Sequence, residues 1–176
     1  MMKTLYNNPI VRQRADPWVY KHTDGYYYMT ASVPAYDGIE IRRAKKLEDL
    51  EKSETKMVWF KHENGEMSEL IWAPEIHNIG NKWYIYFEAD DGNTDNHQIY
   101  VIENDSDDPT KGTFHLKGMI MTNPEWNWGI HPTTFVNKGK QYLLWSGWPK
   151  RRIEAETQCI YIASMKNPWT LESKRV

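Results

Sequence analysis

The sequence of 176 residues contains one cysteine, Cys159, no long apolar run and no excess of charge of either sign. A single cysteine excludes an intrachain disulfide and a metal site built from cysteines. No apolar run reaches the length of a membrane span, and no basic stripe accompanies the formal net charge of −2, so we expect neither a membrane nor a nucleic-acid partner. Residues 1–8 hold one lysine and no apolar signal-peptide core, which fits a cytoplasmic protein or a secreted protein whose signal has been removed.

Aromatic residues, by contrast, are abundant. They make up 14% of the chain, with nine Trp and eleven Tyr. Such a composition is typical of strands with a β-rich core, and equally of a site where flat ligands or sugar rings stack. Composition leaves these two alternatives open.

A proline-centred pattern occurs three times along the chain. It begins at Asp16-Pro17, Ala73-Pro74 and His131-Pro132, so that the starts are separated by 57 and 58 residues. Each copy continues with a short apolar segment, a polar turn containing glycine, and an aromatic or apolar strand. The copies align without a gap from the residue before the proline to the second strand, which indicates an internal repeat.

Each repeat contains segments for four strands, so the fold class is predicted to be all-β. Four antiparallel strands per repeat of this length are typical of a β-propeller blade; the alternative is a β-sandwich with the same strand spacing. We expect one domain, residues 1–176, with blades at about 14–65, 70–122 and 128–176. Propellers use about four to eight blades, so three predict an incomplete ring with a blade face left open.

The residue before each inner strand should point into the funnel at one end of the propeller. Asp16, Ala73 and His131 occupy this place. A carboxylate at Asp16 is well positioned as a general base, although Asp-Pro is also a common turn opener. Four tryptophans lie near these positions and are candidate platforms for a sugar ring: Trp18, Trp72, Trp126 and Trp128. Of these four, Trp72 and Trp128 are preferred.

Four stretches resemble glycoside hydrolase family 43, and especially its exo-acting α-1,5-L-arabinofuranosidases. The resemblance covers nearly the whole chain, and its strength lies in the order and spacing of the stretches. They are residues 8–17 (NPIVRQRADP), residues 71–77 (IWAPEIH) with residues 82–87 (KWYIYF), residues 129–135 (GIHPTTF) and residues 167–171 (NPWTL).

This resemblance implies a five-bladed propeller that cleaves arabinose- or xylose-containing polysaccharides with inversion. We expect no cofactor. It implies that Asp16 is the catalytic base. The family has, at the position of His131, an Asp that orients the general acid and tunes its pKa, and an imidazole there would remove that negative charge. The family's general acid is a Glu on the fourth blade, which we expect to lie beyond this sequence.

Other carboxylates are candidates for the site. Glu75 follows the second inner-strand start and is a candidate substrate contact; the alternatives are a structural role and service as a substitute general acid. Glu88, Asp90 and Asp91 end a strand and are expected to be solvated loop residues.

Three further side chains complete the candidates. Arg14 is a candidate donor to a sugar hydroxyl or partner of a carboxylate, and an ordinary surface arginine is the alternative. His77 and His97 have no spacing partner, so no metal site is predicted.

Three functions therefore remain as hypotheses. The first is a family-43 hydrolase fragment with impaired turnover, because of His131 and the missing acid. The second is a non-catalytic carbohydrate-binding propeller. The third is an interaction role, in which the open blade face pairs with another copy or a complementing chain.

Overall fold

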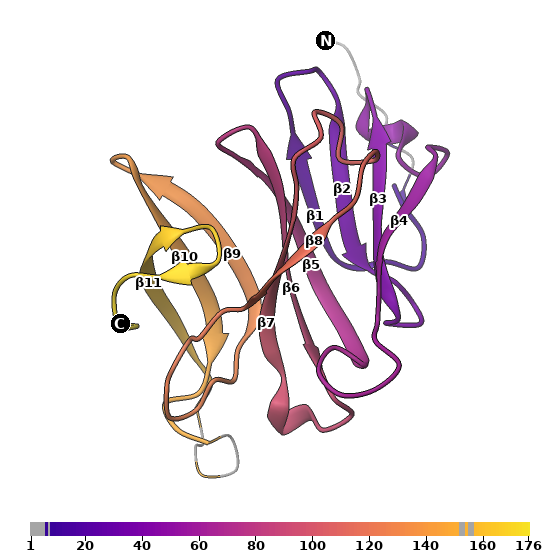
Figure 1. Ribbon diagram of the computed structural model, residues 1–176. Helices are drawn as coiled ribbons and strands as arrows, with labels where there is room; N and C mark the ends of the chain where they lie inside the picture. The colour runs from indigo at the N-terminus through magenta and orange to yellow at the C-terminus, as the bar shows by residue number, and fades with distance from the viewer. Residues whose placement is uncertain (1–5, 7, 152–153, 155–156) are drawn as a thin grey trace.

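The computed structural model describes residue 6, residues 8–151, residue 154 and residues 157–176, and these form three separate four-stranded antiparallel sheets (Figure 1). The first contains β1 (Ala15–Lys21), β2 (Tyr27–Ser32), β3 (Gly38–Ala44) and β4 (Thr55–Phe60). The second contains β5 (Glu69–Ile79), β6 (Lys82–Asp90), β7 (Gln98–Asn104) and β8 (His115–Met119). The third contains β9 (Ile130–Asn137), β10 (Lys140–Gly147), β11 (Cys159–Asn167) and β12 (Thr170–Leu171).

Within each sheet the spatial order of the strands equals their order in the sequence, and the three sheets are called blades 1, 2 and 3. Two short 3₁₀ turns, η1 (Leu47–Asp49) and η2 (Thr94–Asn96), lie in the connections. Tight hairpins explain this meander: Gly80 and Asn81 both have positive φ (59° and 63°), the backbone of a type I′ turn that matches strand twist. The predicted all-β class and the blade architecture are confirmed.

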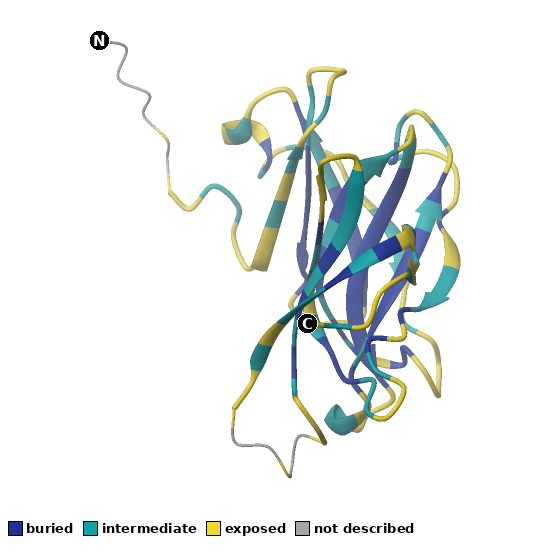
Figure 2. Ribbon diagram, turned by 90° about the vertical axis from the view of Figure 1, so that its left-hand side faces the viewer, coloured by how far each residue is buried: buried dark blue, intermediate teal, exposed yellow. Residues whose placement is uncertain are grey.

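Blade 2 is buried on both faces because its strands alternate between two hydrophobic clusters (Figure 2). On β6, Trp83, Ile85 and Phe87 pack toward Tyr28, Ile39 and Ile41 of blade 1. From the same strand, Tyr84 and Tyr86 pack toward Leu143, Trp145, Ala163 and Met165 of blade 3. Neighbouring blades therefore complete each other's cores, as in other repeat architectures.

The inner strands are longer than the sequence predicted. We expected them to begin after each proline, whereas β1, β5 and β9 run through Asp16-Pro17, Ala73-Pro74 and His131-Pro132. Irregularities of register accompany the prolines in all three strands. Proline cannot donate to the ladder, so the strand continues past it only with a local bulge.

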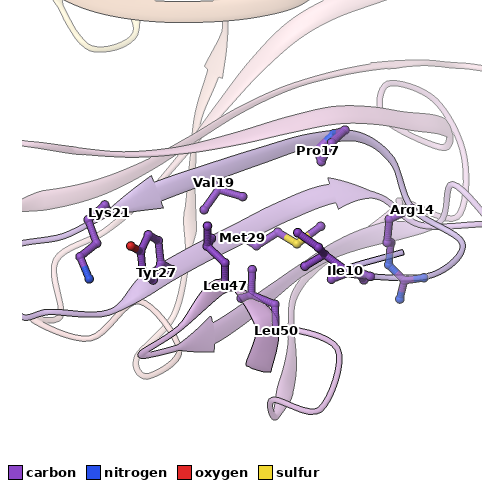
Figure 3. Close-up of a pocket in the computed structure, with 10 residues that line it drawn as sticks. Ile10, Arg14, Pro17, Val19, Lys21, Tyr27, Met29, Leu47 and Leu50 are labelled. Carbon is purple, nitrogen blue, oxygen red and sulfur yellow. The ribbon is translucent and has the colours of Figure 1, made fainter. Parts of the chain in front are cut away.

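Two blade faces point away from blade 2. On blade 1, β1, β2 and η1 line an apolar groove of about 540 Å³, where Val19, Tyr27, Met29 and Leu50 lie side by side (Figure 3). On blade 3, the register places Phe135, Tyr142, Leu144, Ile160 and Ile162 on the face opposite to the buried Leu143 and Trp145. This set is called the outer face of blade 3.

Among the residues that the structure describes, no helix is long and apolar enough to cross a membrane.

Candidate active site

Asp16, Ala73 and His131 share one unusual backbone conformation. Their φ angles are 50°, 41° and 50°, in the left-handed region that non-glycine residues rarely adopt. The strands that carry them are neighbours, since β5 contacts β1 and β2 on one side and β9 on the other. The structure thus supports the equivalence derived from the repeat, and places the three residues at corresponding points of adjacent blades.

Asp16 is exposed and is held in place by a serine that the sequence analysis missed. The Ser32 hydroxyl donates to Asp16 Oδ2 at 2.9 Å, and the backbone N–H of Ala73 donates to the same Ser32 Oγ at 2.8 Å. Ser32 is 2% exposed, so this link between blades 1 and 2 is shielded from water. The arrangement orients an accessible carboxylate, which is what a general base requires. No sequence signal singles out Ser32 among the residues of β2.

Glu75 and His77 form a pair on β5. Glu75 Oε2 lies 3.1 Å from His77 Nε2, and the His77 ring packs 4.8 Å from the centroid of Trp18. Trp18 in turn donates its indole N–H to the carbonyl oxygen of Ile76 at 2.8 Å. His77 therefore has a carboxylate partner that its position in the sequence did not reveal, and Trp18 contributes to the interface between blades 1 and 2.

The expectation of three solvated carboxylates at the end of β6 was wrong for two of them. Glu88 is 0% exposed and Asp90 is 1% exposed, whereas Asp91 is exposed. Asp90 Oδ2 lies 2.9 Å from Nδ1 of His97, itself 1% exposed. The reason is that β6 is buried from Trp83 to Asp90, between the hydrophobic cluster shared with blade 1 and the one shared with blade 3.

Glu88 has an unusual electrostatic environment. Neither of its oxygens has a hydrogen-bond partner of standard geometry among the described residues. Burial raises the pKa of Glu88 well above its ordinary value; the backbone N–H of His131 opposes this shift, and the charges of Asp16 and Glu75 add to it. Glu88 is therefore close enough to Asp16, Glu75 and His131 to interact with them, and it was absent from our predicted site.

The two preferred tryptophans are both engaged by the protein. Trp72 is half-buried and stacks on His97, with ring centroids 4.5 Å apart and an interplanar angle of 29°. Trp128 is only 6% exposed and donates its indole N–H to the carbonyl oxygen of Thr94 at 2.8 Å. Trp128 therefore offers little ring surface in this structure, and the role of both rings as sugar platforms stays a prediction.

Arg14 lies two residues before Asp16 and is bonded to a carboxylate. Its Nε and Nη2 donate to the two oxygens of Glu40 at 2.8 and 2.9 Å, and Arg42 Nε donates to Glu40 Oε1 at 2.9 Å. Of these roles for Arg14, the structure shows the carboxylate pair. Contact with a sugar hydroxyl remains a prediction.

His131 is exposed and occupies the third equivalent position. Of the residues described, no group of three or more His, Cys, Asp or Glu side chains is arranged to hold a metal ion. The chemistry that these residues can provide is proton transfer by an exposed carboxylate, next to a buried carboxyl group and an imidazole.

Comparisons with known proteins match one family over nearly the whole chain. A sequence profile described as "Glycosyl hydrolases family 43" matches residues 6–176. An extracellular exo-α-(1→5)-L-arabinofuranosidase of Streptomyces chartreusis is 41% identical over 173 residues, which cover 97% of this chain and 52% of the relative. Alpha-L-arabinofuranosidase 43 of Humicola insolens is 37% identical, and the match covers 97% of this chain and 35% of that protein.

Solved structures agree with this result. The crystal structure of an α-L-arabinofuranosidase from Lactobacillus brevis superposes with a TM-score of 0.89 at 45% identity, covering 97% of this chain and 55% of that one. An endo-arabinase from Bacteroides thetaiotaomicron superposes at 0.71 with 18% identity, and shows the same fold. The chain thus spans about half the length, or less, of the relatives that it matches.

Proposed function

Since the chain belongs to glycoside hydrolase family 43, we propose that it forms part of a hydrolase acting on terminal α-L-arabinofuranosyl units of arabinose-containing plant polysaccharides, and that Asp16 is the general base. The observation that carries this proposal is the exposed Asp16 carboxylate, oriented by Ser32 at an inner-strand bulge. The similarity to exo-acting arabinofuranosidases supports the sugar.

The proposed reaction inverts the anomeric carbon. Asp16 takes a proton from a water molecule while the water oxygen attacks the anomeric carbon from the face opposite to the leaving group. The bond to the leaving oxygen breaks, and that oxygen takes a proton from a carboxylic acid. In inverting enzymes the two carboxyl groups stand about 6.5–9.5 Å apart, which leaves room for the water.

We propose that turnover by this chain alone is negligible. His131 stands where the family resemblance places the carboxylate that tunes the acid, and loss of acid assistance typically costs about 10²–10⁴-fold in rate. The same observation at His131 favours a second candidate function, binding of arabinose-containing oligosaccharides without hydrolysis.

An activated substrate isolates the role of Asp16. A nitrophenyl α-L-arabinofuranoside has a leaving group that needs little protonation, so residual hydrolysis reports mainly on the base. We expect Asp16→Asn to lower this residual rate by about 10²-fold or more, with little change in the binding of arabino-oligosaccharides measured by calorimetry. Asp37→Asn, at an exposed loop aspartate, is the matched control and should leave the rate unchanged.

The outcomes separate the candidates. Equal rates for Asp16→Asn and the unchanged protein would exclude Asp16 as the base. Oligosaccharide binding without any product, even from the activated substrate, would favour the binding module. Neither binding nor product would contradict both.

We also propose that the chain self-associates through the outer face of blade 3. Phe135 and Ile160 on this face are 42% and 69% exposed, although the opposite face of the same sheet is buried. An apolar sheet face left open is a typical association site.

Sedimentation velocity over a range of concentrations tests this association. We expect the unchanged protein to form a larger species at high concentration, and Ile160→Lys to shift it to the monomer. Val136→Lys changes an exposed residue that points to the other side of β9, and should have no effect. A monomer at every concentration would contradict the proposal.

A further inference from the structure

The fully buried carboxyl group of Glu88 lies at the level of the three equivalent residues. In the register of β5 and β6, Glu88 is opposite Trp72, the residue before Ala73. On its other side, in β7, the opposite residue is the apolar Ile99. Glu88 therefore lies on the strand next to the inner strand of blade 2, level with Trp72, the residue before Ala73.

The groups that face Glu88 disfavour a negative charge. Asp16 of β1 and Glu75 of β5 are both acidic and both raise its pKa, and burial adds the largest effect. The one favourable contribution comes from the backbone N–H of His131 in β9. A buried carboxylate that has no hydrogen bond of standard geometry and no nearby cation is costly, and protonation is the usual outcome.

We propose that Glu88 is a positioning residue of the Asp16 site: it is a neutral carboxylic acid in the folded protein, supports the backbone at His131, and leaves the negative charge of the cluster on the exposed Asp16. The role at Asp16 rests on the proposed function. The protonation state of Glu88 does not.

Glu88 and Asp16 are neighbouring carboxyl groups with different roles in this proposal. Two adjacent carboxylates repel each other, so a second negative charge at Glu88, next to Asp16, is unfavourable. When environments push the pKa values of two such groups apart, the buried one holds the proton and the solvated one is free to accept one. Burial at Glu88 and exposure at Asp16 provide this difference.

Infrared difference spectroscopy tests the protonation state directly on the intact chain. At pH 7 we expect the C=O stretch of a protonated carboxylic acid, and we expect it to vanish in Glu88→Gln. Glu103→Gln is the matched control, because Glu103 on the neighbouring β7 accepts from Tyr84 and Lys82 and has a lowered pKa. That variant should leave the band unchanged. A spectrum without the band at pH 7, or a band that persists in Glu88→Gln, would overturn the proposal.

Stability as a function of pH gives a second readout. Because the folded-state pKa of Glu88 is raised, its proton stabilises the fold fully below the unfolded pKa of about 4.3, and this stability is lost as pH rises toward the folded pKa. We expect the unfolding free energy of the unchanged protein to fall relative to Glu88→Gln as pH rises through this window. If the difference in unfolding free energy between the two proteins stayed constant over this pH range, the result would contradict a neutral Glu88.

The positioning role has its own test. Gln is isosteric with the neutral acid, so Glu88→Gln should keep the amide NMR signal of His131 where it is in the unchanged protein. Glu88→Leu should shift the His131 amide. A His131 amide signal that shifts as far in Glu88→Gln as in Glu88→Leu, or that stays unchanged in Glu88→Leu, would refute the positioning role. If these results hold and no sugar binds, the proposed function fails while the assignment of Glu88 stands.

Discussion

We expect Trp83→Ala to lower the free energy of unfolding by about 3–5 kcal/mol, the usual cost of deleting a buried tryptophan. Trp83 is 1% exposed and lies between blades 1 and 2. Its ring is 4.8 Å from Tyr28, 4.7 Å from His22 and 5.7 Å from Tyr20, measured between centroids. Removing it leaves a cavity in the interface that also positions Asp16 against Ala73. Urea denaturation followed by circular dichroism measures the change.

Two further variants sharpen this experiment. Trp83→Phe keeps a ring in the same place and should cost less than Trp83→Ala. Phe60→Ala removes an aromatic side chain that is 64% exposed, and should change stability by less than about 0.5 kcal/mol. If Trp83→Ala cost no more than Phe60→Ala, the interface between blades 1 and 2 would not stabilise the chain as described.

The second large effect is expected at Glu40, which carries the ion pairs of Arg14 and Arg42. The Glu40 side chain is 7% exposed, and those of Arg14 and Arg42 are 15% and 12% exposed. We expect Glu40→Gln to lower the free energy of unfolding by about 2–4 kcal/mol at pH 7, because two nearly buried guanidinium groups then lose their counter-charge. Since Arg14 lies two residues before Asp16, we expect the variant also to make the start of β1 less firmly held.

The pH dependence of this variant identifies the cause. Burial alone would raise the pKa of Glu40, but the hydrogen bonds and charges of Arg14 and Arg42 outweigh it and lower the pKa. A lowered folded pKa means that the stabilisation is present above the unfolded pKa of about 4.3 and is lost as pH falls through the folded value. The difference in unfolding free energy between Glu40→Gln and the unchanged protein should therefore become smaller below about pH 4.

An exposed ion pair is the control for Glu40. Lys61 Nζ lies 2.8 Å from Glu69 Oε1, and the two side chains are 35% and 49% exposed. Glu69→Gln should cost between 0 and about 1 kcal/mol. A cost for Glu40→Gln that is the same at pH 3 and pH 7 would exclude the ion pairs as its source.

The sequence determined the architecture because the repeat is local. Turns such as Gly80-Asn81, the prolines at 17, 74 and 132, and the aromatic strands are visible in short windows, and each fixes a hairpin or an inner strand. The same alignment of repeats identified Asp16 and His131 as equivalent positions. Their shared left-handed backbone supports that equivalence in the structure.

Only the tertiary structure decided which charged groups are buried and with which partners. Glu88 and Asp91 are three residues apart and look alike in sequence, yet Glu88 is fully buried and Asp91 is exposed. Ser32 meets Ala73 across 41 residues of chain, and Arg14 meets Glu40 across 26. These contacts depend on how one blade packs on the next. A single sequence specifies the strands of each blade, but the burial and ionisation of a side chain follow from the neighbouring blades that surround it.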